Sequence, residues 1–224
     1  MEITDGVYAF PQTIERDGAE RTFYPSAVDT PTGLLLVDVG LQGQVEQIEA
    51  NLTEAGFDWD DVRGVIITHQ DGDHAGALSA VLERTDATVY THAGCSPYVD
   101  GRKHPIKSSD DERYPPVGVD VALVGGVAFR TEAGPMDVVF TPGHTPGHIS
   151  LHLPDAGVLL AADATVADED GLAGPDERFT LDMDEALESL AKLATLEFDR
   201  TLCHHGGLVD EGTSRLAALV DDDL

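Results

Sequence analysis

Four potential metal ligands fall within six consecutive residues, and no other feature of the sequence constrains its fold and chemistry as strongly. His69, Asp71, Asp73 and His74 follow directly after the apolar run 65–67. If these imidazoles and carboxylates are buried together, they need a cation to neutralise and order them. A loop that leaves a strand is also where a scaffold commonly places its chemistry. The alternative is a solvated acidic turn beside which two histidines lie by chance.

Three further apolar runs end in histidine or aspartate and are followed by small or turn-forming residues. They are closed by His144 after 138–140, Asp163 after 159–162, and His204–His205 after 202–203. Because the strands of one sheet present their ends along a common edge, we expect these side chains to converge with the first four. His148 lies four residues past His144 and is expected to make a structural hydrogen bond.

With these motifs in place, the chain resembles the metallo-β-lactamase-fold superfamily of metallohydrolases. The resemblance begins near 5–8, passes through 34–40 and ends at 205–206, so it covers nearly the whole length. The usual first motif of the family is H-x-H-x-D-H, and Asp71 here replaces its second histidine. The resemblance implies an α+β fold, namely a four-layer αββα sandwich of two mixed sheets flanked by helices. Without a repeat or linker in the sequence, a single domain over residues 1–224 is expected.

The resemblance also implies a ligand set for two divalent metal ions. The first ion would be held by His69, Asp71 and His144, the second by Asp73, His74 and His205, and Asp163 would bridge the two. His205 is favoured over His204 because the glycine that follows it matches the family pattern. Zinc is the commonest metal in such hydrolytic sites, while imidazole with carboxylate also suits iron or manganese.

The function implied is hydrolysis of a small ester, thioester or lactone by a hydroxide formed from water at the metal ions. Asp73 would be the catalytic residue, orienting this hydroxide and accepting its proton. Two alternatives stay open. One is iron-dependent redox chemistry resembling that of the sulfur dioxygenases, and the other is a non-catalytic metal-binding sensor module. In either enzymatic case the expected partner is a small-molecule substrate.

Hydrophobic periodicity predicts the scaffold around these motifs. Strands are expected at 33–38, 65–68, 149–153 and 158–162, helices at 44–55, 76–84 and 183–196, and a polar loop at 101–118. Asp38 either orients a ligand histidine or caps a turn. In the polar loop, Arg102, Lys103 and Lys107 form a local basic cluster where an anionic substrate group would dock.

The charge of the chain narrows the classes of partner. The formal net charge is −29, with 42 acidic residues spread along the whole sequence. Such a balance resembles that of proteins from salt-adapted organisms and argues against binding to nucleic acid, which uses basic patches. The sequence has no apolar stretch of the roughly 20 residues that cross a bilayer and no signal-peptide pattern. A cytoplasmic protein is therefore expected, and its oligomeric state stays open.

Overall fold

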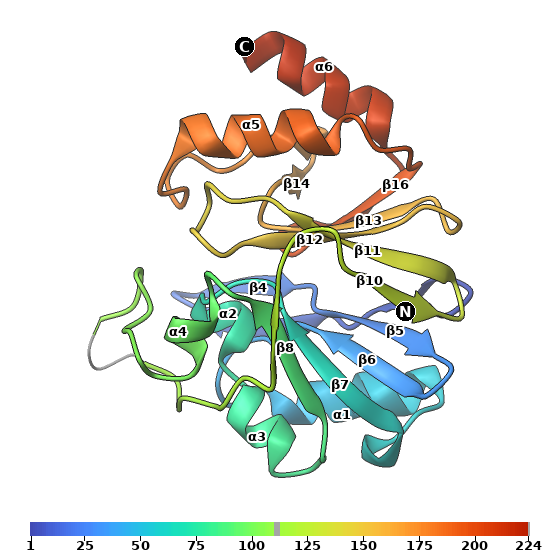
Figure 1. Cartoon of the computed structure of the whole chain (residues 1–224), viewed down its shortest axis with the longest axis vertical. Helices are drawn as coiled ribbons and strands as arrows, with labels where there is room; N and C mark the ends of the chain where they lie inside the picture. The colour runs from blue at the N-terminus through green and yellow to red at the C-terminus, as the bar shows by residue number, and fades with distance from the viewer. Residues whose placement is uncertain (110–112, 224) are drawn as a thin grey trace.

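In residues 1–109 and 113–223, which the computed structural model describes, two large β-sheets lie face to face with helices on their outer sides (Figure 1). The first sheet has the order β1-β2-β5-β6-β7-β8-β9 and the second has the order β10-β11-β12-β13-β16-β17. The strands of the first sheet are β1 (Glu2–Thr4), β2 (Val7–Ala9), β5 (Ser26–Thr30), β6 (Gly33–Val37), β7 (Val62–Ile67), β8 (Thr88–His92) and β9 (Val121–Leu123). Those of the second sheet are β10 (Ala128–Thr131), β11 (Gly134–Phe140), β12 (Ile149–Leu153), β13 (Val158–Ala162), β16 (Arg200–Cys203) and β17 (Gly207–Val209).

Helices and smaller strand pairs complete the described chain. The helices are α1 (Val45–Ala55), the 3₁₀ turn η1 (Trp59–Asp61), α2 (Gly72–Ala75), α3 (Leu78–Leu82), α4 (Ser96–Val99), α5 (Met183–Leu193) and α6 (Thr213–Asp223). The small pairs are β3 (Gln12–Arg16) with β4 (Ala19–Phe23), and β14 (Val166–Asp168) with β15 (Gly171–Ala173). No helix among these residues is long and apolar enough to cross a membrane.

The described part of the chain buries its apolar side chains in three clusters, and their positions define four layers. One cluster joins α1 and α3 to the first sheet and includes Ile48 and Leu78. The next fills the space between the sheets and includes Ile66 and Leu151. The last lies between the second sheet and the helices α5 and α6, with Leu190 at its centre. The predicted αββα sandwich is confirmed.

Local sequence signals account for α1 and α5, two of the 11-residue helices next to the sheets. In α1 the apolar side chains at 45, 48 and 52 recur at helical spacing and are buried. Gly56 ends the helix with φ 87°, a left-handed conformation that glycine adopts without steric cost. Helix α5 begins where the Asp182 carboxylate accepts the backbone N–H of Glu185 at 3.0 Å. It ends at Leu193, three residues short of the predicted end at 196.

Parallel strand pairs bring the functional loops together. β6 pairs in parallel with β7, and β13 pairs in parallel with β16, so the loops after each pair leave the same sheet edge. The prediction that all four strand ends share one sheet is wrong, because β7 belongs to the first sheet while β11, β13 and β16 belong to the second. The backbone N–H of Ile149 donates to the carbonyl of Thr68 at 3.1 Å and joins the two sheet edges at this point.

Candidate metal centre

The first motif loop begins at Thr68, where β7 ends, and turns immediately into the short helix α2. Asp38, which follows β6, accepts the Thr68 backbone N–H at 2.8 Å and the Thr68 hydroxyl at 2.7 Å. The same carboxylate lies 2.7 Å from Nδ1 of His74. Because Asp38 accepts at this position, His74 keeps a proton on Nδ1, so that Nε2 is the nitrogen that can bind a metal once it is deprotonated. Asp38 therefore orients a ligand histidine, the first of its two predicted roles.

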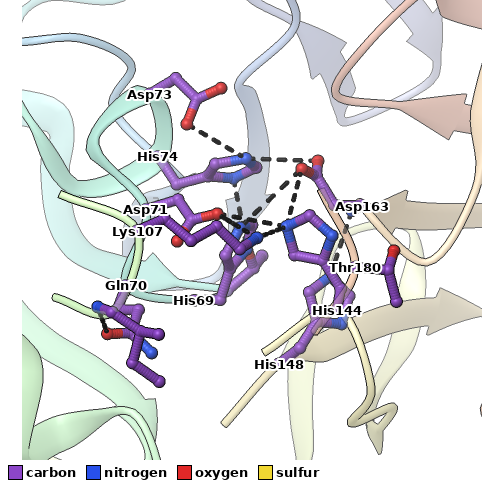
Figure 2. Close-up of polar contacts among 12 residues, drawn as sticks. His69, Gln70, Asp71, Asp73, His74, Lys107, His144, His148, Asp163 and Thr180 are labelled. Atoms are coloured by element: carbon purple, nitrogen blue, oxygen red, sulfur yellow. Dashed lines mark hydrogen bonds and ion pairs between the residues drawn. The ribbon is translucent and has the colours of Figure 1, made fainter. Parts of the chain in front are cut away.

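All seven predicted ligands converge between the two sheet edges, and Figure 2 shows six of them by name. The donor atoms form groups within 4.8 Å of one another. Three of the groups are made of predicted ligands alone, namely His69–Asp71–His144, His69–His74–Asp163 and Asp73–His74–His205, and a fourth joins His74 to Asp38 and His204. The first and third match the two predicted sites, and the second joins them through Asp163.

The first group has separations that suit metal coordination. Oδ2 of Asp71 lies 3.4 Å from Nε2 of His69 and 3.2 Å from Nε2 of His144. A tetrahedron whose corners lie about 2.1 Å from a central metal ion has edges of about 3.4 Å. The Thr68 hydroxyl lies 3.1 Å from Nδ1 of His69 and, since it donates to Asp38, accepts the ring proton there. Nε2 of His69 is thereby left free.

The group that joins the two predicted sites is centred on the carboxylate of Asp163. Its Oδ1 lies 3.2 Å from Nε2 of His74, and its Oδ2 lies 3.3 Å from Nε2 of both His144 and His205. Nε2 of His205 also lies 3.3 Å from Oδ2 of Asp73. Oδ1 of Asp163 thus faces His74, a ligand proposed for the second ion. Its Oδ2 faces His144 and His205, which are proposed ligands of the first and the second ion. This is the arrangement a bridging carboxylate needs.

The donor atoms at the centre are buried and make no hydrogen bond to any described residue. These atoms are Nε2 of His69, Nε2 of His74, Oδ1 of Asp71 and Oδ1 of Asp163. Leaving such atoms unpaired costs about 1–3 kcal/mol each, and a divalent cation at the centre would satisfy them together. Imidazole nitrogen with carboxylate oxygen is a donor set for zinc, manganese or iron. The residues present fit a metal centre.

The charges of these groups are set by one another. Burial alone would raise the pKa of Asp163, but the nearby imidazole of His74 outweighs it and holds that pKa well below its usual range. Burial would lower the pKa of His205, yet contacts with Asp163 and Asp73 raise it to about 9. The pKa of His74 is likewise raised well above its ordinary value, since three carboxylates outweigh its burial. Without metal, the carboxylates are balanced by imidazolium charge.

Two other histidines support the centre without joining the three groups of predicted ligands described above. His148 accepts the backbone N–H of Asp163 on Nε2 at 3.1 Å and contacts the Thr141 hydroxyl through Nδ1 at 2.9 Å. The predicted structural hydrogen bond of His148 is confirmed, and it fixes the backbone that carries the bridging carboxylate. His204 stacks on the ring of His74 at 3.7 Å, on the side of Asp38.

The loop that carries His144 is held by helix α5. Gly143 has φ 124°, and a Cβ atom there would lie 2.3 Å from the backbone nitrogen of Ala186 in the first turn of α5. The Asp182 N–H donates to the Gly143 carbonyl at 3.0 Å, and the Ser189 hydroxyl donates to the Pro142 carbonyl at 2.7 Å. Only glycine permits this close approach of loop and helix at 143. The pattern of apolar residues in α5 gave no sign of this contact.

His205 is placed by a second close backbone approach. Gly206 has φ 100°, and a Cβ atom on it would lie 1.9 Å from the carbonyl oxygen of Ala167 in β14. The Ala167 N–H donates to the His205 carbonyl at 2.9 Å, and His205 also forms an isolated β-bridge with Phe23. These contacts direct His205 into the centre, where its side chain is 39% exposed. His205 shares a group with Asp73 and His74, whereas His204 shares one with Asp38 and His74, so the preference for His205 stays a prediction.

The three residues of the predicted basic cluster contact different partners, and docking of an anionic substrate there stays a prediction. The Arg102 guanidinium pairs with Asp100 at 2.6 Å, and Nζ of Lys103 lies 5.3 Å from the ring centroid of Tyr98. Lys107 contacts the first ligand group (Figure 2). The sequence gave no signal for this placement, because 37 residues separate Lys107 from its partner His144.

Comparison with known proteins agrees with the fold and the donor set, which together define a metal-binding hydrolase scaffold. The family model of the metallo-beta-lactamase superfamily matches residues 26–205. The chain therefore belongs to the metallo-beta-lactamase superfamily.

Named relatives agree with this membership, and solved structures share the fold. It is 31% identical over 204 residues to the Bacillus subtilis protein named "Probable metallo-hydrolase YflN", covering 79% of this chain and 76% of the relative. It is 30% identical to a hydroxyacylglutathione hydrolase of Ruegeria pomeroyi, where the match covers 79% of this chain and 59% of the relative. A metallo-beta-lactamase family protein from Thermus thermophilus superposes with a TM-score of 0.80 at 23% identity, over 99% of this chain and 80% of the other.

Proposed function

We propose that this protein is a metal-dependent hydrolase that cleaves a small ester, thioester or lactone. The proposal is carried by the buried donor atoms of His69, His74 and Asp163, which face one another without hydrogen-bond partners among the described residues. Relatives named hydroxyacylglutathione hydrolase support hydrolysis, and that name describes cleavage of a thioester. Because the chain spans 59% of the Ruegeria pomeroyi relative, the choice among these substrates is left to experiment.

The ligand sets proposed for two metal ions correspond to two of the groups of donor atoms described above. His69, Asp71 and His144 would hold the first ion, Asp73, His74 and His205 the second, and Asp163 would contact both. Bound divalent ions, with zinc as the leading candidate, would supply a water that ionises near neutral pH and an electrophile for the substrate carbonyl.

The exposure and charge of the ligand residues indicate where a substrate would enter and which residue would handle the proton. The side chains of Asp73 and His205 are 22% and 39% exposed, whereas His69, His74 and Asp163 are at most 6% exposed. A substrate would therefore enter on the side of Asp73. Burial would raise the pKa of Asp73, but the charge of His74 outweighs it and lowers the pKa below the usual range. Asp73 stays ionised, so it can orient an attacking water and take up its proton as the tetrahedral adduct of the substrate collapses.

The test is a hydrolysis screen over thioesters, lactones, simple esters and phosphoesters, with zinc, manganese or iron added. Because of the acidic composition, it is run in both dilute and multimolar potassium chloride. We expect turnover with at least one carbonyl substrate, and a loss of kcat of about 10²–10⁴-fold in Asp73→Asn. The matched control is Asp17→Asn, the same change in an exposed turn.

Three outcomes would point elsewhere. Bound iron with oxygen uptake would favour the redox alternative, and bound metal without turnover on any substrate would favour a sensor module. Unchanged kcat in Asp73→Asn would remove the catalytic role of that residue. A cytoplasmic location and a small-molecule substrate belong to this same proposal.

A further inference from the structure

Lys107 lies inside the first ligand group and contacts two of its three members. Its Nζ atom is 2.7 Å from Oδ2 of Asp71 and 2.7 Å from Nε2 of His144 (Figure 2). Lys107 is an exposed residue, but its side chain is 22% exposed because it folds onto this group. This placement is not a surface ion pair made by chance, because one cation meets two proposed metal ligands at once.

The loop that carries Lys107 is fastened to the first motif. The Ile106 N–H donates to Oε1 of Gln70 at 2.9 Å, and the Tyr114 hydroxyl donates to the Gln70 carbonyl at 2.9 Å. Gln70 sits between the ligands at 69 and 71. These hydrogen bonds fix the backbone next to Lys107 relative to the ligands. The fold therefore holds the Lys107 side chain close to Asp71 and His144.

The contact between Lys107 and His144 determines whether Nε2 of His144 can bind a metal ion. An ammonium group only donates hydrogen bonds, so Nε2 of His144 must accept from Lys107. An unprotonated imidazole nitrogen has one lone pair in the ring plane, and a metal ion needs the same lone pair. His144 therefore binds either Lys107 or a metal ion. Oδ2 of Asp71 is likewise engaged by the ammonium.

The group Asp73–His74–His205, proposed for the second ion, has no such competitor among the described residues. Within the described residues, the ion pairs of Asp73, His74 and His205 join imidazoles to carboxylates, and none of them involves a lysine or arginine. A metal ion that enters this group displaces no lysine or arginine of the described chain. The two groups are therefore unequal before any metal binds.

We propose that Lys107 is a built-in competitor for the first metal site, holding Asp71 and His144 until a metal ion displaces it. The inference rests on the proposed metal-dependent function. It predicts that the protein fills its sites in order. One ion binds tightly to Asp73, His74, His205 and Asp163, and a second ion binds weakly, because it must expel the ammonium.

The test is a zinc titration of metal-free protein by calorimetry with a competing chelator. We expect wild type to bind two zinc ions, the second with a dissociation constant at least about tenfold higher than the first. Lys107→Gln and Lys107→Met remove the charge and should bring the two dissociation constants within about tenfold of each other. Lys103→Gln is the matched control, since Lys103 lies in the same loop but contacts Tyr98. Circular dichroism checks that each variant is folded.

A second measurement needs no variant. In nitrogen-15 spectra of the wild-type imidazoles, one equivalent of zinc should shift the ring signals of His74 and His205 and leave those of His144 in place. Two equal sites in wild type, or an unchanged separation in both Lys107 variants, would overturn the role of Lys107 alone. Absence of zinc binding in every protein would overturn the proposed function and this inference with it.

Discussion

The substitution Asp38→Asn should weaken metal binding although Asp38 is not a member of either proposed ligand set. Asp38 is 4% exposed and has φ 60°, a left-handed conformation that asparagine also tolerates. The change therefore preserves shape and backbone while replacing one carboxylate oxygen by an NH₂ group. What it alters is the hydrogen bond that fixes the proton of His74.

The magnitude follows from the three contacts of the carboxylate. Oδ1 accepts the Thr68 backbone N–H, which cannot reverse, so the amide oxygen must occupy that position. The NH₂ group then faces the Thr68 hydroxyl and Nδ1 of His74, each at 2.7 Å in the native protein. His74 would accept on Nδ1 and carry its proton on Nε2, the atom that must bind metal. Reversing this leaves one buried donor unpaired, at about 1–3 kcal/mol or about 5- to 140-fold in affinity.

The assay is competition for zinc against a chromophoric chelator at a fixed pH. Asp17→Asn is the matched control, because Asp17 has φ 56° in the exposed turn between β3 and β4. We expect the control to match wild type while Asp38→Asn loses affinity in the stated range. Wild-type affinity in Asp38→Asn would refute the argument that Asp38 sets the tautomer of His74.

The remaining predictions concern pH and backbone fit. Burial lowers the pKa of His205, but Asp163 and Asp73 raise it to about 9, and the pKa of His74 is also raised. Zinc binding at pH 7 should therefore release about two protons, measured by calorimetry in buffers of different ionisation enthalpy; release near zero would contradict this charge assignment. Since the folded-state pKa of His205 exceeds its unfolded value, its contribution to metal-free stability is full below about pH 6.5 and is lost as pH rises through about 9. A urea titration at several pH values would detect that loss, and a constant stability would count against it. Finally, Gly206→Ala should destabilise the fold by more than the about 1–3 kcal/mol of left-handed strain alone, because its Cβ would meet the Ala167 carbonyl, whereas Gly43→Ala has the strain without the clash. Equal denaturation midpoints for the two variants would show that the close approach at 206 does not matter.

The first motif could be recognised in the sequence because its spacing is local. His69, Asp71, Asp73 and His74 lie between the end of β7 and the end of α2, so one short segment carries all four side chains. The helix α1 was also predictable, since its apolar periodicity and its closing glycine agree. Both features depend on residues that are close in sequence.

The features that the sequence did not reveal depend on contacts between distant residues. The strand ends that meet at the centre belong to both sheets, and pairing between sheets leaves no periodic signal. Lys107 reaches Asp71 across 36 residues, and Gly143 needs its small size because of Ala186. Gly72, by contrast, lies in open space at the start of α2, so a Cβ atom there would meet no steric barrier. Helix α6 and the pair β14–β15 also had no predicted counterpart.

The central claim is that imidazoles and carboxylates from both sheet edges bind a divalent metal ion around Asp163. Anomalous X-ray diffraction at the zinc absorption edge, on crystals grown with zinc, tests it most directly. We predict a peak about 2.0–2.2 Å from a carboxylate oxygen of Asp163 and from Nε2 of His74. An anomalous map with no peak within about 3 Å of both atoms, beyond any coordinating distance, would contradict it.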